Sequence, residues 1–191
     1  MPVIRTNLEK DPAVVYMLDS DLRIRYCNEA WDRFAIENGG HGLERQHQLG
    51  RPVMDVIPAP LKRFYQQGYD QVLSSGQPWE QDYDCSSPAV YRRFRMAVYP
   101  DPEGDGLSVV NSLAVDRPHG AEIVPRGVNE FVYLDEHGHV TMCCHCRRTC
   151  RANHPHVWGW VPANLEGPPG SVSHGLCAVC ANLIYSLSGL Q

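Results

Sequence analysis

Hydrophobic positions recur with two different periods in the first 117 residues, and they predict alternating strands and helices. Val14–Leu18 is a short apolar run, and Leu22–Cys27 alternates apolar side chains with two arginines, as a half-buried strand does. The polar turn Asp19-Ser20-Asp21 between them predicts a hairpin. Asn28 is a good helix cap, so a helix is expected to follow it and to end at Asn38-Gly39-Gly40.

A longer helix and three strands are predicted next. Apolar side chains share one helical stripe at Leu61, Phe64, Tyr65, Tyr69, Val72 and Leu73, and Ser74-Ser75-Gly76 ends it. Strand patterns then cover Trp79–Cys85, Tyr91–Tyr99 and Leu107–Val115. Two strands, helices and a three-stranded meander predict an α+β domain: a five-stranded antiparallel sheet with helices crossing one face.

In this order the residues resemble a PAS domain. The resemblance lies in Tyr26–Trp31, in Leu49–Pro52 with Asp55–Ile57, and in the long helix and closing hairpin. Finer details are similar to a group of bacterial PAS-like proteins, namely Trp31–Gly40, Cys85–Pro88 and Arg92–Met96. The resemblance implies a sensory domain that holds a small molecule between sheet and helices, and that signals as a dimer.

Composition changes sharply toward the C-terminus. Residues 128–191 are a third of the chain of 191 residues but hold six of its eight cysteines. We therefore predict a PAS-like sensory domain over 1–117, a linker over 118–128 and a zinc-ribbon-like module over 129–191. A hairpin of Phe131–Leu134 and Val140–Met142 is expected to lead into Cys143.

The cysteines form two C-x-x-C pairs, Cys143 with Cys146 and Cys177 with Cys180, separated by thirty residues. Each pair can place two thiolates on one side of a metal ion, so two pairs supply the four sulfur ligands of a tetrahedral zinc site. The positive charges of Arg147 and Arg148 would offset the negative charges of the thiolates. Trp158, Trp160 and Val161 would supply a small core.

Residues 142–148, 158–162 and 173–180 look like a small cysteine module at the C-terminus of bacterial PAS-containing signalling proteins. The resemblance implies Cys143, Cys146, Cys177 and Cys180 as metal ligands. Cys144 and Cys150 lie outside that pattern and could compete for the first pair. A redox dithiol and an iron site are the alternatives to zinc. His145 and His174 are interpreted as neighbours of the metal or surface groups, and His154 and His156 as solvent-facing.

Asn111 interrupts an apolar row on the last strand, so it is our candidate ligand contact in the PAS interior; a hydrogen bond within the fold is the alternative. A flavin is disfavoured because the chain has no Asn-Cys-Arg-Phe run. Haem stays open, although residues 60–75 contain no histidine; His41, His47 and Cys27 are the available ligands, and the two histidines are expected to be exposed. Cys85, like Cys27, could be a buried apolar residue.

Charge and hydropathy disfavour several partners. The net charge is −5, from 17 Lys and Arg against 22 Asp and Glu, which disfavours nucleic acid. Arg92, Arg93 and Arg95 are interpreted as a solvated strand face that pairs with Glu80, Asp82 and Asp84. No apolar stretch is long enough to span a membrane, and the start has no secretory core, so a cytoplasmic location is expected.

The sequence therefore predicts a sensory or regulatory signal-transduction protein with a structural zinc site. No catalytic residues are assigned, because the chain has no nucleotide loop, catalytic triad order or kinase signature. A thiol-redox or metal-responsive protein and a haem sensor are the alternatives. A homodimer is expected, with Val3, Ile4 and Leu8 as apolar contact residues, together with a signalling partner that the sequence does not identify.

Overall fold

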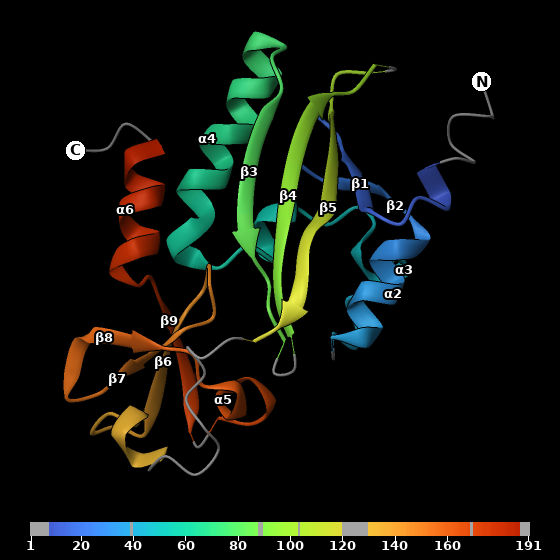
Figure 1. Ribbon diagram of the computed structural model, residues 1–191. Helices are drawn as coiled ribbons and strands as arrows, with labels where there is room; N and C mark the ends of the chain where they lie inside the picture. The colour runs from blue at the N-terminus through green and yellow to red at the C-terminus, as the bar shows by residue number, and fades with distance from the viewer. Residues whose placement is uncertain are drawn as a thin grey trace. The chain divides into compact units, whose positions relative to one another are not determined.

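The computed structural model describes residues 8–38, 40–87, 90–102, 104–119, 130–168 and 170–187. It confirms the predicted fold class, because a five-stranded antiparallel sheet with helices is followed by a second, smaller sheet that carries a cysteine cluster (Figure 1). No helix within these residues is long and apolar enough to cross a membrane.

The N-terminal part follows the predicted order of elements. Its strands and helices are β1 (Val14–Leu18), β2 (Ile24–Cys27), α2 (Glu29–Glu37), α3 (Arg45–Gln48), the 3-10 turn η1 (Val53–Asp55), α4 (Ala59–Ser75), β3 (Trp79–Asp84), β4 (Val90–Pro100) and β5 (Leu107–Pro118). The strand order is β2-β1-β5-β4-β3, so the first and last strands of the sequence pattern meet in the middle of the sheet.

Local chemistry explains where these elements begin. The second strand begins at Ile24 rather than at the predicted Leu22, because Leu22 lies in the turn with a left-handed φ of 58°. Asn28 caps α2, as predicted, and accepts a hydrogen bond from the backbone N–H of Trp31. Gly76, with φ of 67°, follows α4 and permits the left-handed turn that ends it.

The core of this part lies where the sheet meets the helices. Alternate side chains of the strands and one stripe of α4 are almost fully buried, including Val15, Leu18, Ile24, Tyr69, Val72, Met96, Val98, Leu107 and Val109. The period-2 and period-3.6 patterns therefore identified these buried faces, except at the end of β5, where Leu113 and Val115 of the apolar row are exposed.

Gly68 shows how closely α4 approaches β3. A methyl group at this position would lie 2.6 Å from Cδ2 of Trp79, which is inside van der Waals contact. Alanine normally stabilises a helix interior by about 1 kcal/mol relative to glycine. We expect the opposite for Gly68→Ala, a loss of about 1–3 kcal/mol in the free energy of unfolding measured by urea denaturation.

Trp79→Ala supplies the control for this prediction. With the indole removed, Gly68→Ala should recover the normal helix preference and become neutral or stabilising. A Gly68→Ala effect that is equal in both backgrounds would contradict the assigned contact.

The C-terminal part contains η2 (Glu130–Tyr133), β6 (His139–Cys143), β7 (Thr149–Arg151), β8 (His154–Gly159), α5 (Pro162–Glu166), β9 (Ser171–Gly175) and α6 (Ala178–Leu187). Its sheet has the order β8-β7-β6-β9. The predicted strand Phe131–Leu134 is wrong, since residues 130–133 form a 3-10 turn and only Leu134 bridges to Val140. The predicted turn is present, and Gly138 occupies a left-handed position (φ of 74°) there.

Contacts within the chain separate two compact units. One consists of Met1–Ile57, Tyr65–Asp82 and Phe94–Ala114, and the other of Pro58–Phe64, Tyr83–Arg93 and Val115–Gln191. The predicted linker over 118–128 lies outside the described residues except for Pro118 and His119. The boundaries at 117 and 129 therefore stay a prediction.

Candidate metal centre

The parallel pairing of β6 with β9 explains how the two C-x-x-C pairs meet. Cys143 ends β6 and pairs in register with Gly175, the last residue of β9. Because parallel strands end at the same edge of a sheet, Cys177, two residues beyond β9, lies beside Cys143. The intervening residues form β7, β8 and α5, which is the ordered excursion that such a parallel connection requires.

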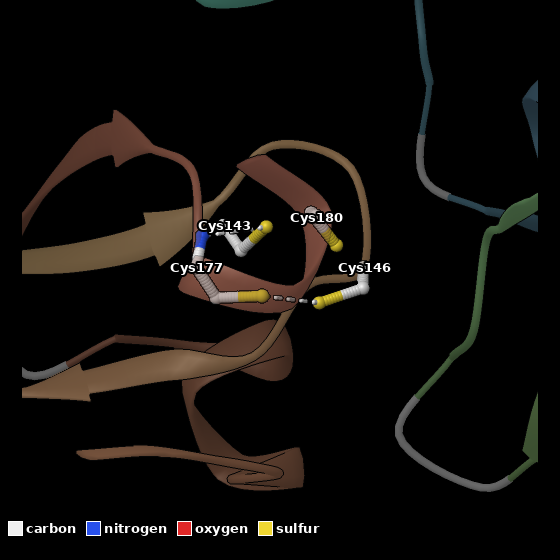
Figure 2. A group of neighbouring side chains, drawn as sticks. All are labelled: Cys143, Cys146, Cys177 and Cys180. Carbon is white, nitrogen blue, oxygen red and sulfur yellow. Dashed lines mark hydrogen bonds between the residues drawn. The ribbon is translucent and has the colours of Figure 1, made fainter. Parts of the chain in front are cut away.

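Four sulfur atoms converge at this edge, one from each of Cys143, Cys146, Cys177 and Cys180, a set we call the four-cysteine cluster. Figure 2 shows Cys143 at the end of β6, Cys146 on the loop that follows, and Cys177 and Cys180 around the start of α6, with the sulfurs facing one another. All four side chains are buried, and their Sγ atoms lie within 4.8 Å of one another. The structure therefore brings together all four predicted ligands.

The size of the cluster fits a metal ion. Tetrahedral Zn–S bonds of about 2.3 Å place sulfurs about 3.8 Å apart. The Sγ atoms of Cys146 and Cys177 are 3.7 Å apart. Because four thiolates fill a tetrahedron, such a site has no open position for water or substrate.

Positive and polar groups offset the charge of the sulfurs. The backbone N–H of Cys177 donates to Sγ of Cys143 at 3.4 Å, and Nη1 of Arg148 lies 4.0 Å from Sγ of Cys146. Cys177 and Cys180 also lie at the N-terminal end of α6, where the helix dipole favours thiolates. Four thiolates around a divalent ion leave a formal charge of about −2, which these groups partly neutralise.

The titration of the cluster is coupled, because the sulfurs share protons. Hydrogen bonds from the thiols of Cys146 and Cys180 hold the pKa of Cys143 well below its usual range. The same hydrogen bond to Cys143 raises the pKa of Cys146 to about 12, and it raises the pKa of Cys180 as well. A divalent cation would replace the shared protons, so metal binding and proton release are linked here.

Arg147, which follows the first cysteine pair, has an unusual backbone conformation. It is not a glycine, yet its φ is 63°, in the left-handed region. Its N–H donates to the carbonyl of Cys143, and the N–H of Cys143 donates to the carbonyl of Arg148, so the turn is closed on both sides. A strained residue of this kind persists where the surrounding structure over-determines the turn, as a metal-binding loop does.

Cys144 and Cys150 lie outside the four-cysteine cluster. The backbone N–H of Cys144 donates to the carbonyl of Gly175, and burial raises the pKa of its thiol to about 11. The Cys150 thiol donates to the carbonyls of Arg151 and Pro155, at 3.5 Å each. Both residues are buried, and the Cys150 thiol is directed to partners outside the cluster.

The histidines near the cluster differ in their surroundings. His145 is buried, and its Nδ1 lies 3.5 Å from Sγ of Cys180. Burial lowers the pKa of His145. His174, His154 and His156 are exposed, as expected for the last two.

The predicted small core is present beside the cluster. Trp158 and Leu176 pack directly against the four cysteines, and Trp160 and Val161 are buried. Val140 and Met142 on β6 are buried as well. The cluster is therefore part of the core rather than a surface site.

Two amide side chains of the PAS part are buried. Nδ2 of Asn111 donates to the backbone carbonyl of Val14 at 3.4 Å, so this side chain makes a hydrogen bond within the sheet; its role as a ligand contact stays a prediction. Gln48 is fully buried, its Nε2 donates to the carbonyl of Gly42, and its Oε1 has no hydrogen-bond partner within the described residues. Gln48 was missed in the sequence, because an exposed polar stretch surrounds it.

The other candidate side chains lie as the sequence patterns indicate. His41 and His47 are exposed. Burial raises the pKa of the Cys27 thiol to about 12 and raises that of Cys85. The basic cluster pairs across the hairpin, with Arg93 to Asp84 and Arg95 to Asp82, each at 2.9 Å.

Comparison with known proteins identifies the N-terminal part. Residues 8–113 match the PAS fold, and the chain therefore belongs to the PAS-fold family. Members of this family are typically sensory domains. No curated protein matches the chain.

Several solved PAS-fold structures are similar. The PAS domain of BvgS from Bordetella pertussis is 20% identical, with 63% of this chain and 88% of that chain covered and a TM-score of 0.44. VqmA from Vibrio cholera, in a complex with ligand and DNA, is 17% identical, with 59% of this chain and 51% of that chain covered and a TM-score of 0.44. The PAS domain of an HTR-like protein from Haloarcula marismortui is 14% identical, with 59% and 89% covered and a TM-score of 0.39.

Proposed function

We propose that this chain is a sensory or regulatory signal-transduction protein, in which a PAS domain binds a small ligand or a partner and a structural zinc ion stabilises the C-terminal module. The observation that supports the zinc assignment is the four-cysteine cluster, whose buried sulfurs lie within 4.8 Å of one another and include one pair 3.7 Å apart. In this role the metal supplies a cross-link between Cys143–Cys146 and Cys177–Cys180, and no chemical step.

Membership of the PAS-fold family supports the sensory role. The unused acceptor on Gln48 supports a ligand that carries an N–H or O–H donor, because a buried acceptor without a donor costs about 1–3 kcal/mol. Asn111 is proposed as the second polar contact. The partner is proposed to be another signalling protein or a second copy of the chain, as a homodimer in the bacterial cytoplasm. Of the apolar residues proposed for self-association, Val3 and Ile4 lie outside the described residues, and Leu8 is half-buried.

The alternatives receive less support. A thiol oxidoreductase needs an exposed cysteine of low pKa, whereas Cys143 is fully buried and the pKa of Cys144 and that of Cys150 are both raised. A haem site would need the exposed His41 or His47, or the buried Cys27. No observation favours either of these over the structural zinc site.

One preparation of the purified full-length chain tests the proposal. We expect one zinc ion per chain by metal mass spectrometry, no Soret or flavin band in the visible spectrum, and a dimer by sedimentation. An iron–sulfur absorption band would replace the zinc assignment. A Soret band would show that the chain binds haem. A folded wild type with no metal would refute the structural zinc site, and a monomer at high micromolar concentration would refute self-association.

A further inference from the structure

His145 makes a contact that joins the two cysteine pairs independently of a metal ion. It lies between Cys144 and Cys146 in the first pair, is only 7% exposed, and has its Nδ1 3.5 Å from Sγ of Cys180 in the second pair. An N···S distance of this length permits a hydrogen bond. We propose that His145 is a positioning residue that donates its Nδ1–H to the metal-bound thiolate of Cys180; this inference rests on the proposed metal site.

The direction of the hydrogen bond follows from the chemistry of a bound thiolate. Metal-bound Cys180 carries no proton and can only accept, so the proton must be on Nδ1 of His145. The opposite tautomer would direct a lone pair of Nδ1 at the negative sulfur. It would also leave Nε2–H as a buried donor, and Nε2 has no partner within the described part of the chain. The structure therefore favours the Nδ1–H tautomer.

The other sulfurs have donors of different kinds. Cys143 receives a backbone N–H from Cys177, and Cys146 lies near the guanidinium of Arg148. Besides the neighbouring sulfurs of the cluster, Cys180 has the imidazole of His145 at hydrogen-bonding distance. The imidazole thus withdraws electron density from this thiolate and fixes its orientation, as groups that support metal ligands commonly do.

Three substitutions separate hydrogen bonding from packing. His145→Leu removes the donor, His145→Asn can place an amide N–H near the position of Nδ1, and His174→Leu is the matched control at an exposed histidine close to the second pair. Zinc affinity is measured by competition with a chromogenic chelator. We expect His145→Leu to weaken affinity by about 10- to 100-fold, His145→Asn to restore most of it, and His174→Leu to have no effect.

Two spectroscopic readouts complete the test. In cobalt-substituted protein the sulfur-to-metal charge-transfer band should shift in His145→Leu and return in His145→Asn. Long-range ¹H–¹⁵N NMR of the zinc-loaded wild type should show the Nδ1–H tautomer of His145, which is independent of any variant's folding.

The outcomes that refute the inference are distinct from failure of the proposed function. An Nε2–H tautomer in the zinc-loaded protein would overturn the hydrogen bond, as would wild-type affinity in His145→Leu or equal losses in the Leu and Asn variants. A wild type that binds no metal at all would instead overturn the metal site on which the inference rests.

Discussion

Replacing Cys143 or Cys180 by serine is expected to abolish stoichiometric zinc binding and to unfold the C-terminal module. Both side chains are buried in the four-cysteine cluster, and their sulfurs join the end of β6 to the start of α6. Binding of structural zinc contributes about 10–16 kcal/mol in zinc-finger peptides, and this free energy is folding free energy. The free energy lost with one ligand should therefore exceed the folding stability that the apolar core of so small a module can supply.

Metal content by mass spectrometry and thermal melting by circular dichroism measure this effect. We expect the transition of the module to disappear in Cys143→Ser and Cys180→Ser, while the PAS part stays largely folded. Chelation of wild-type protein should produce the same loss. Cys150→Ser is the matched control, because Cys150 is equally buried but its thiol bonds to the carbonyls of Arg151 and Pro155 instead. It should retain one zinc ion.

Retention of zinc in Cys143→Ser would assign the first pair to Cys144 or Cys150 instead. Loss of zinc in Cys150→Ser, with the same loss of the module, would contradict the cluster as described. A well-folded wild type without metal would refute the structural role.

The PAS part could be predicted from the sequence because its order comes from local patterns. Apolar residues recur at every second position in Leu22–Cys27 and about every 3.6 positions from Leu61 to Leu73. The buried face of each segment can therefore be predicted from that segment alone. The turns are equally local. One error lies at a strand end, at Leu22, where the turn has a left-handed backbone. The short helix α3 and its buried Gln48 were also missed, because no periodic pattern marks them.

The C-terminal module was predicted less well, because its order depends on distant pairing. The parallel register of β6 and β9 joins residues about thirty positions apart, and no local pattern reports it. The strand predicted for Phe131–Leu134 failed because only Leu134 finds a strand partner. The cysteine spacing nevertheless predicted which four sulfurs come together, because such a cluster depends on residue types and two short loops rather than on sheet register.

The role of His145 shows a further limit. Sequence spacing allowed it to be a neighbour of the metal, but its contact to Cys180 depends on how the two pairs approach. Asn28 shows the same limit, since the helix cap was predicted and its contacts to the preceding segment were not.

Replacing Asn28 should cause the largest loss of stability among single polar substitutions in the PAS part. The side chain is fully buried, and Oδ1 accepts from the backbone N–H groups of Val15 and Trp31 at 3.0 and 3.2 Å. Its Nδ2 donates to the carbonyls of Leu8, Asp11 and Ala13 at 3.1, 3.3 and 2.8 Å. One amide therefore joins the start of α2, the strand β1 and the segment that precedes it.

Asn28→Ala and Asn28→Asp separate the two halves of this network, and urea denaturation of the PAS transition measures both. Asn28→Ala removes the helix cap and leaves buried backbone groups unpaired, so we expect a loss of about 3–5 kcal/mol. Asparagine and aspartate cap helices equally well, but Asn28→Asp turns a carboxylate oxygen toward three carbonyls. Asn28→Asp should therefore be at least as destabilising, whereas Asn38→Ala, at the exposed end of α2, should cost about 1 kcal/mol or less. Wild-type stability in Asn28→Asp would show that the carbonyls of residues 8–13 do not depend on this amide.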